Sequence, residues 1–132
     1  MASLPPSKGP AVPATIMFVD DSPSMRLLLR AALGDLGYAM AEAEDGMQAL
    51  ERIEGAAPDL LITDINMPNL DGFGLIERLR ASPKHRNLPI LVLTTESSDE
   101  KKQRARSAGA TGWIVKPFHP DQFAAAIRRV LH

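Results

Sequence analysis

Short apolar segments alternate five times with segments of helical periodicity along this chain. The apolar segments are residues 15–19, 38–43, 60–63, 89–93 and 113–115. Runs this short that lack polar alternation are typical of strands buried on both faces of a sheet. Strands that alternate with amphipathic helices predict a parallel sheet with helices on both faces. The 132 residues therefore predict one α/β domain of three layers, with the least apolar strand, 38–43, at an edge.

Residues that typically begin or end helices lie between the predicted strands. Ser22-Pro23 is typical of an N-cap followed by proline at the first helical position, and Gly37 of a helix end. The other helices are expected over about 46–55, 72–80, 98–108 and from Pro120. The helical spacing predicts that the inner faces carry Met25, Leu28, Leu29, Ala32, Leu33 and Leu36 in the first helix and Met47, Leu50 and Ile53 in the second. Segment 98–108 has only Ala105 and Ala108 for an inner face.

Polar residues follow four of the strands directly. They are Asp20 and Asp21 after the first strand, Asp64 after the third, Thr94 at the end of the fourth and Lys116 after the fifth. Parallel sheets of this class collect function at the carboxyl ends of their strands. The sequence therefore predicts that three carboxylates, a hydroxyl and an amine project from one edge.

These residue types suit one kind of chemistry. Three clustered carboxylates repel one another unless a cation joins them. Oxygen ligands without His or Cys favour a hard cation, Mg²⁺ or Mn²⁺, which shares its remaining positions with waters and a phosphate oxygen. Lys116 and Thr94 add an ammonium and a hydroxyl donor, so the group predicts a phosphoryl site in which an aspartate attacks phosphorus.

Composition excludes several other classes. The chain has no cysteine, so disulfides and thiolate sites are excluded. A net charge of −1 gives no reason to expect nucleic-acid or membrane partners. No apolar run approaches the length of a bilayer span, and the N-terminus lacks a signal-peptide core, so a cytoplasmic location is the default expectation. Four prolines within residues 1–13 predict a flexible leader before a domain over 14–132.

Three motifs now carry a family resemblance. After Asp20-Asp21 come Asp64-Ile65-Asn66-Met67-Pro68-Asn69-Leu70-Asp71-Gly72, then Thr94, then Lys116-Pro117-Phe118. Together they resemble the receiver domain of two-component response regulators, most closely the single-domain chemotaxis regulators, over about residues 14–131. The resemblance implies a flavodoxin-like (βα)5 sandwich with strand order 2-1-3-4-5, in which the first and third strands are neighbours.

The resemblance also implies a role for each site residue. Asp64 would accept a phosphoryl group from a phosphohistidine of a histidine kinase. Asp21, Asp64 and the backbone carbonyl of Asn66 would ligate Mg²⁺, with Asp20 acting through a metal-bound water. Lys116 would pair with a phosphoryl oxygen, and the Lys116-Pro117 bond would be cis. Thr94 and Trp113 would form the switch, with Trp113 standing where tyrosine is common. Asn66 and Glu96 would tune dephosphorylation, and both match the chemotaxis type that loses its phosphoryl group quickly.

The implied function is a binding module and not an enzyme beyond its own phosphotransfer and autodephosphorylation. Because the chain ends at His132, directly after the last helix, no output domain is expected. Output would be a protein contact made by the fourth helix, fifth strand and fifth helix. The expected partners of this monomer are a chemotaxis-type histidine kinase, a flagellar motor switch protein or other output protein, and a phosphatase. The basic residues Lys101, Lys102, Arg104 and Arg106 fit a partner surface or a solvated helix face equally well.

Other functions stay open on the sequence. One is a single-domain regulator or phosphate sink of a phosphorelay outside motility. Another is a Mg²⁺-dependent aspartyl phosphohydrolase, although such enzymes carry an Asp-x-Asp pattern on the first strand and a cap domain, and this chain has Asp20-Asp21 and no segment long enough for a cap. A flavin protein of the same fold would face repulsion between three carboxylates and the flavin phosphate. For Trp113 alone, a core aromatic is the plainer interpretation.

Overall fold

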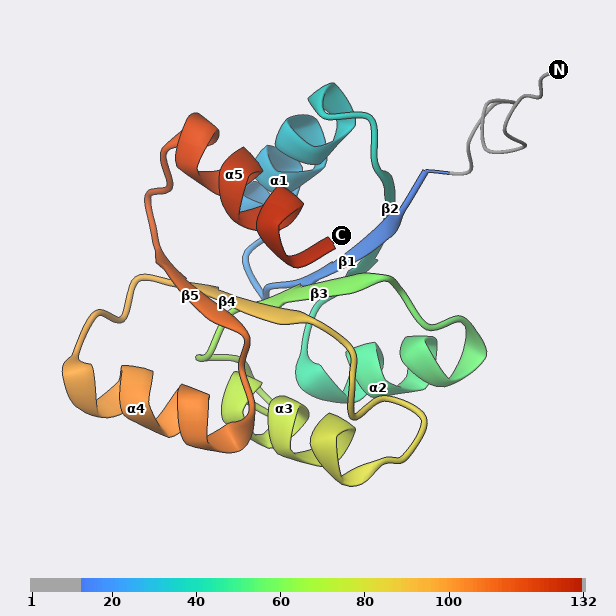
Figure 1. Ribbon diagram of the computed structural model, residues 1–132, viewed down its shortest axis with the longest axis vertical. Helices are drawn as coiled ribbons and strands as arrows, with labels where there is room; N and C mark the ends of the chain where they lie inside the picture. The colour runs from blue at the N-terminus through green and yellow to red at the C-terminus, as the bar shows by residue number, and fades with distance from the viewer. Residues whose placement is uncertain (1–12, 132) are drawn as a thin grey trace, which may run out of the picture.

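The computed structural model describes residues 13–131 and shows a sheet between two layers of helices (Figure 1). The strands are β1 (Thr15–Val19), β2 (Ala39–Ala43), β3 (Leu60–Thr63), β4 (Ile90–Thr94) and β5 (Gly112–Val115). The helices are α1 (Pro23–Asp35), α2 (Gly46–Gly55), α3 (Gly72–Ala81), α4 (Asp99–Ala108) and α5 (Pro120–Leu131). The proposed leader lies outside the described residues, except for Pro13.

The strands pair in the order β2-β1-β3-β4-β5, and every pair is parallel, which confirms the expected fold class. β1 lies between β2 and β3, with Val19 opposite Thr63. The residues that follow these strands, Asp20 and Asp64, therefore leave the sheet side by side. β2 occupies an edge, as its weak hydrophobicity predicted.

Side chains of β1 alternate between two hydrophobic cores. Ile16 and Phe18 pack on the face covered by α1 and α5, whereas Met17 and Val19 pack on the face covered by α2, α3 and α4 (Figure 1). All four side chains are buried, so the strand is apolar throughout without alternation. Within residues 13–131, no helix combines the length and apolar character that a bilayer span requires.

The predicted inner faces of the first two helices are wrong in part. Leu28 is 51% exposed and Leu36 39% exposed, while Leu29 and Leu33 form the buried stripe of α1. Met47, in α2, is 47% exposed. Ile53 is buried and Leu50 packs against the core, as predicted, but the other buried residues of α2 are Gly46 and Ala49, because the start of this helix packs against the loop between β3 and α3 and not only against the sheet. The polar helix α4 buries only Ala105, and Ala108, the second residue expected on its inner face, is partly buried against the same core.

Gly72 begins α3 where the backbone approaches Asp64 closely. A Cβ added at Gly72 would overlap the carbonyl oxygen of Asp64. We expect Gly72→Ala to lower the free energy of unfolding by about 2 kcal/mol, the usual cost of overpacking. Gly55→Ala is the matched control, because its added Cβ meets nothing within 4 Å. It should leave stability unchanged or raise it by up to about 1 kcal/mol in urea unfolding. Equal midpoints for the two variants would show that the close approach is absent.

Candidate functional site

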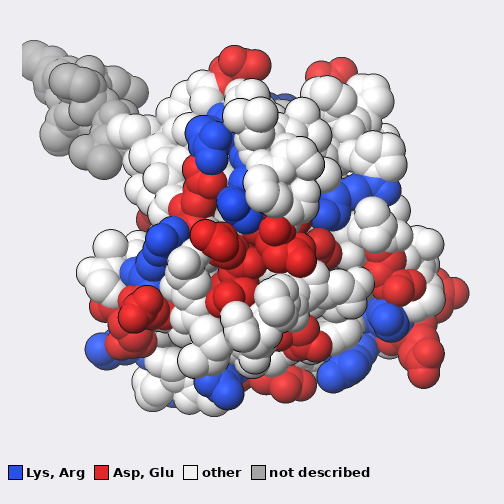
Figure 2. Space-filling model, turned by 180° about the vertical axis from the view of Figure 1, so that it is seen from behind, with Lys and Arg blue, Asp and Glu red and all other residues white. Residues whose placement is uncertain are grey.

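Three aspartates meet at the carboxyl edge of the sheet. Asp20 and Asp21 follow β1, Asp64 follows β3, and one carboxylate oxygen from each lies within 4.8 Å of the others. Asp20 is buried at 2% exposure, Asp64 is half-buried and Asp21 is exposed, so the group is open to water on one side. In the space-filling view, acidic side chains gather in the middle of the face shown, with Lys and Arg around them (Figure 2).

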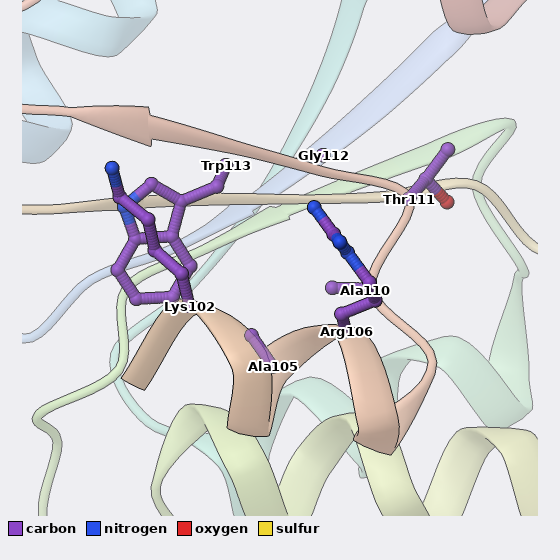
Figure 3. A pocket seen from close by; sticks show the side chains of 7 residues that line it. All are labelled: Lys102, Ala105, Arg106, Ala110, Thr111, Gly112 and Trp113. Carbon is purple, nitrogen blue, oxygen red and sulfur yellow. The ribbon is translucent and has the colours of Figure 1, made fainter. Parts of the chain in front are cut away.

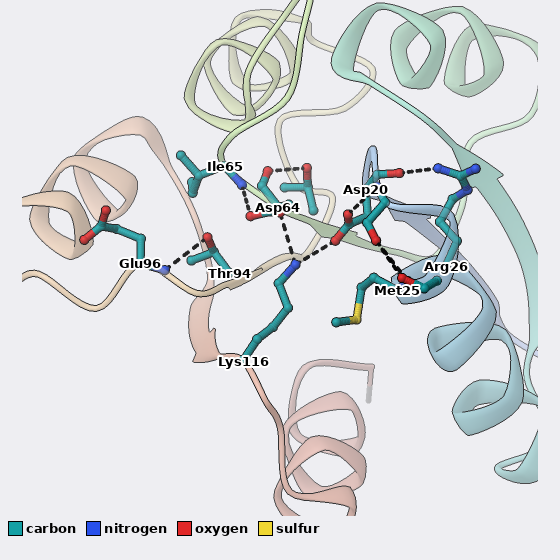
Figure 4. A network of polar contacts seen from close by, with 11 residues as sticks. Asp20, Met25, Arg26, Asp64, Ile65, Thr94, Glu96 and Lys116 are labelled. Carbon is teal, nitrogen blue, oxygen red and sulfur yellow. Dashed lines mark hydrogen bonds and ion pairs between the residues drawn. The ribbon is translucent and has the colours of Figure 1, made fainter.

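Lys116 joins two of these aspartates. Its Nζ donates to Asp20 Oδ2 at 2.8 Å and to Asp64 Oδ2 at 3.1 Å (Figure 4). Burial by itself lowers the pKa of Lys116, but the hydrogen bond to Asp20 and the two carboxylate charges outweigh it and raise the pKa above 10.5. The ammonium is therefore charged at neutral pH, and its stabilising effect is lost only as the pH rises through that raised pKa.

The turn after β1 fixes Asp20 from two sides. Asp20 Oδ1 accepts a hydrogen bond from the Ser22 backbone at 2.9 Å, and the Asp20 carbonyl accepts one from Arg26 Nη1 at 2.6 Å (Figure 4). Arg26 also lies 3.5 Å from the Glu42 carboxylate. Arg26 was not predicted from the sequence as a residue of this site. The available signal was its position in the first turns of α1, within reach of the acidic pair that precedes this helix.

Asp64 is oriented by its own neighbours in sequence. Its Oδ1 accepts a hydrogen bond from the Ile65 backbone at 2.7 Å, and its backbone N–H donates to Val19 in β1 at 3.0 Å. Oδ2 faces Lys116. The carboxylate thus stands at the centre of the group, with Asp20 and Lys116 on one side and Thr94 on the other (Figure 4).

The donor set fits a magnesium ion. Mg²⁺ binds oxygen at about 2.1 Å, so two ligands on opposite sides lie about 4.2 Å apart. Ligands in adjacent positions lie about 3.0 Å apart, so the three carboxylate oxygens, which lie within 4.8 Å of one another, would draw closer together around one ion. The exposed side near Asp21 leaves room for the waters that Mg²⁺ retains.

Thr94 ends β4, and Glu96 lies in the loop between β4 and α4. Thr94 is fully buried, and its Oγ1 accepts a hydrogen bond from the Glu96 backbone at 3.3 Å (Figure 4). The Glu96 carboxylate accepts from Ser98 N at 3.3 Å and lies 3.3 Å from Lys101 Nζ. These contacts, led by the Ser98 bond, lower the pKa of Glu96. The structure therefore joins Glu96 to the start of α4 and not to the three aspartates.

Trp113 lies on β5 and packs beside α4 near Lys102 (Figure 3). The ring is half-buried, and its Nε1 is buried without a hydrogen-bond partner among residues 13–131. A cavity of about 100 Å³ lies between β5 and α4 and is lined by Trp113, Lys102, Arg106 and small residues. Trp113 is thus neither a fully buried core residue nor a free surface ring.

Two further sequence expectations concern the backbone. The Lys116-Pro117 bond is cis, as expected. Asn66, whose carbonyl was expected to ligate the metal, lies exposed in the segment that leads from Asp64 to α3.

The side chain of Asn69 in the same segment donates to Asp45 at 2.7 Å, and neither residue had been singled out from the sequence. The bonds from the Gln48 backbone and from Asn69 lower the pKa of Asp45.

Comparison with known proteins agrees with this geometry. The family model described as response regulator receiver domain matches residues 16–128. The chemotaxis protein CheY1 of Helicobacter pylori is 37% identical over 118 residues, which cover 88% of this chain and 95% of that protein. Longer proteins match as well. The gliding motility regulatory protein of Myxococcus xanthus is 39% identical over 101 residues, and these cover 76% of this chain but 13% of that protein.

Solved structures show the same fold. Vibrio cholerae CheY4 superposes with a TM-score of 0.85 at 43% identity, covering 90% of this chain and 99% of that one. The receiver domain of the sensor histidine kinase PA1611 from Pseudomonas aeruginosa PAO1 has a magnesium ion coordinated in its active site cleft. It superposes with a TM-score of 0.84 at 28% identity, covering 90% of this chain and 98% of that one. Family and fold agree, and this chain belongs to the response regulator receiver domain family, among its CheY-like members.

Proposed function

We propose that this chain is a stand-alone response regulator that accepts a phosphoryl group on Asp64 from a histidine kinase, with Mg²⁺, and thereby changes the surface formed by α4, β5 and α5. One observation carries the proposal. Three carboxylates from two adjacent strand ends meet within 4.8 Å, and the Lys116 ammonium joins Asp20 and Asp64. That combination of acids and one cation suits a phosphoryl group and a hard metal ion.

The chemistry is a displacement at phosphorus. An Asp64 oxygen attacks the phosphorus of a phosphohistidine, the new P–O bond forms as the P–N bond breaks, and the bonding electrons stay on the histidine nitrogen. Lys116, now 3.1 Å from Asp64 Oδ2, would move its ammonium to a phosphoryl oxygen. Asp20 and Asp21, with Asp64 and the Asn66 carbonyl, would hold Mg²⁺. When bound, the ion would neutralise charge on the phosphoryl oxygens.

A switch would follow from the contacts of Thr94. Its hydroxyl accepts a bond from Glu96 N and donates none among the described residues, so its proton is available to a phosphoryl oxygen on Asp64. A move of Thr94 would pull the loop that carries Glu96 and the start of α4. α4 buries only Ala105, so little packing opposes its displacement. Trp113, packed beside α4, would take a new position.

Chemotaxis is the pathway we infer, because CheY1 of H. pylori and CheY4 of V. cholerae are chemotaxis proteins that align along most of their own length. The kinase would be of the chemotaxis type, and the output partner a flagellar motor switch protein or another protein that reads α4, β5 and α5. The residues Asn66 and Glu96 suggest a short-lived phosphoryl group. A regulator or phosphate sink outside motility is the alternative.

The decisive test uses the native chain with acetyl phosphate. We expect one phosphoryl group per chain by intact mass with Mg²⁺ and none with EDTA. The emission of Trp113, the single tryptophan, should change in parallel and on adding beryllofluoride with Mg²⁺. Absence of a labile adduct in the presence of Mg²⁺ would reject the proposal. Sustained release of phosphate from many small esters per chain would favour a phosphohydrolase instead.

A further inference from the structure

The segment between Asp64 and α3 forms a loop whose two ends meet at Ile65 and Gly72. Gly72 N donates to the Ile65 carbonyl at 2.8 Å, which closes the loop at its base. Asn66, whose carbonyl is the proposed metal ligand, is the first residue beyond that closure. Its direction therefore depends on how the rest of the loop is held.

Two hydrogen bonds tie residues 66–70 to a distant part of the described chain, and both reach the start of α2. Asn69 Nδ2 donates to Asp45 Oδ2 at 2.7 Å, and the Leu70 carbonyl accepts from Gly46 N at 3.1 Å. Gly46 is needed there, because a Cβ would lie 2.5 Å from the Leu70 carbonyl oxygen. The tip of the loop is thus docked on the N-terminus of α2.

Asn69, which makes one of these two bonds, has a left-handed backbone conformation. Its φ is 70°, and it is the single non-glycine residue with positive φ in the described chain. This left-handed conformation costs free energy for most residues but less for asparagine. Asp45 is held in turn, since its Oδ1 accepts from Gln48 N at 2.8 Å and caps α2. Both oxygens of the Asp45 carboxylate are therefore in use, one for the helix and one for the loop.

We propose that Asp45 and Asn69 form a clip that positions the 66–71 loop, and with it the Asn66 carbonyl, for metal binding at Asp64. The clip goes beyond helix capping, because capping uses Oδ1 alone and leaves Oδ2 free to act on the loop. The inference rests on the proposed function for its metal, but the clip itself is a feature of this chain's own residues. Asp45 and Asn69 are positioning residues, and neither is a metal ligand.

The chain offers a swap that tests the clip without removing the cap. Asn69→Asp places two carboxylates face to face, so the clip should open. Asp45→Asn keeps an oxygen for Gln48, and rotation of the Asn69 amide can restore a neutral bond, so its effect should be small. In the double variant, an amide at position 45 again faces a carboxylate at position 69, and the clip should close. Asn69→Gly tolerates the positive φ but has no amide, so it should behave like Asn69→Asp.

The first readout is Mg²⁺ affinity, measured by the rise of melting temperature with metal concentration. We expect Asn69→Asp and Asn69→Gly to bind Mg²⁺ about fivefold more weakly, the effect of one hydrogen bond, and the double variant to bind as the native chain does. Simple electrostatics predicts the opposite for Asn69→Asp, because an added carboxylate would attract the cation. Tighter binding by Asn69→Asp, or no recovery in the double variant, would overturn the clip.

The second readout needs no metal. Hydrogen exchange at the Gly46 amide, which bonds to Leu70, should become faster in Asn69→Asp and return to the native rate in the double variant. Unchanged exchange in every variant would also reject the clip. These outcomes can be told apart from a failure of the proposed function. If the native chain binds no Mg²⁺, the proposed function is refuted. If the native chain binds Mg²⁺ and the Asn69→Asp variant binds it equally well, only the clip is refuted.

Discussion

Asp64→Asn is expected to abolish phosphorylation of this chain. Asp64 is the one acid of the three that faces both Lys116 and the Thr94 side of the pocket, and an amide oxygen is a far weaker nucleophile than a carboxylate. The rate of phosphoryl uptake from acetyl phosphate with Mg²⁺ should fall by roughly a thousandfold or more, the order observed when an enzyme loses its nucleophile. The change in Trp113 emission should disappear with it. Intact mass and fluorescence on the same samples measure both effects.

Asp59→Asn is the matched control for this prediction. Asp59 lies directly before β3, whereas Asp64 lies directly after it. Asp59 Oδ2 accepts a hydrogen bond from Thr15 N at the opposite edge of the sheet. The same chemical change there should leave phosphoryl uptake within about twofold of the native rate, because the pocket lies at the other end of the strand. An adduct that forms on Asp64→Asn as fast as on the native chain would place the acceptor elsewhere, and peptide mapping would then identify it.

The convergence of Asp20, Asp64 and Lys116 could be predicted because it depends on strand order alone. In a parallel sheet each strand ends at the same edge, so apolar runs that stop at charged residues already place those residues together. The neighbouring positions of β1 and β3 came from the family resemblance, and the structure confirms them. The polar character of α4 could also be predicted, because segment 98–108 has no large apolar residue to bury.

The contacts between loops could not be predicted in the same way. Asp45 and Asn69 are 24 positions apart in two connections, and no periodicity relates them. The start of this helix at about residue 46 was predicted correctly, but a sequence pattern does not show that the second carboxylate oxygen of Asp45 reaches another loop. The exposure of Met47 has the same origin. Helical spacing assumes that the sheet is the only packing surface, whereas Gly46 packs against Leu70.

Lys116→Met should produce the largest loss of stability in the metal-free chain. Without the ammonium, the buried Asp20 carboxylate and the Asp64 carboxylate face each other with no counter-charge between them. Removal of one partner from a buried pair costs about 3–5 kcal/mol, and we expect about 3 kcal/mol because water reaches the site beside Asp21. For a domain of this size, that loss corresponds to a melting temperature roughly 10 °C lower.

The pH and metal dependence of Lys116→Met separate lost charge from lost packing. The deficit should be full at neutral pH and should shrink as the pH rises through the raised pKa of Lys116, because the native chain then loses the same positive charge. Mg²⁺ should raise the melting temperature of the variant more than that of the native chain, since it supplies the missing positive charge. Lys84→Met, whose exposed Nζ lies 3.9 Å from Glu54, should cost less than about 1 kcal/mol at neutral pH. If the loss of stability in Lys116→Met changes with neither pH nor Mg²⁺, the lysine stabilises the fold through its packed methylene chain. The electrostatic account of the pocket would then be wrong.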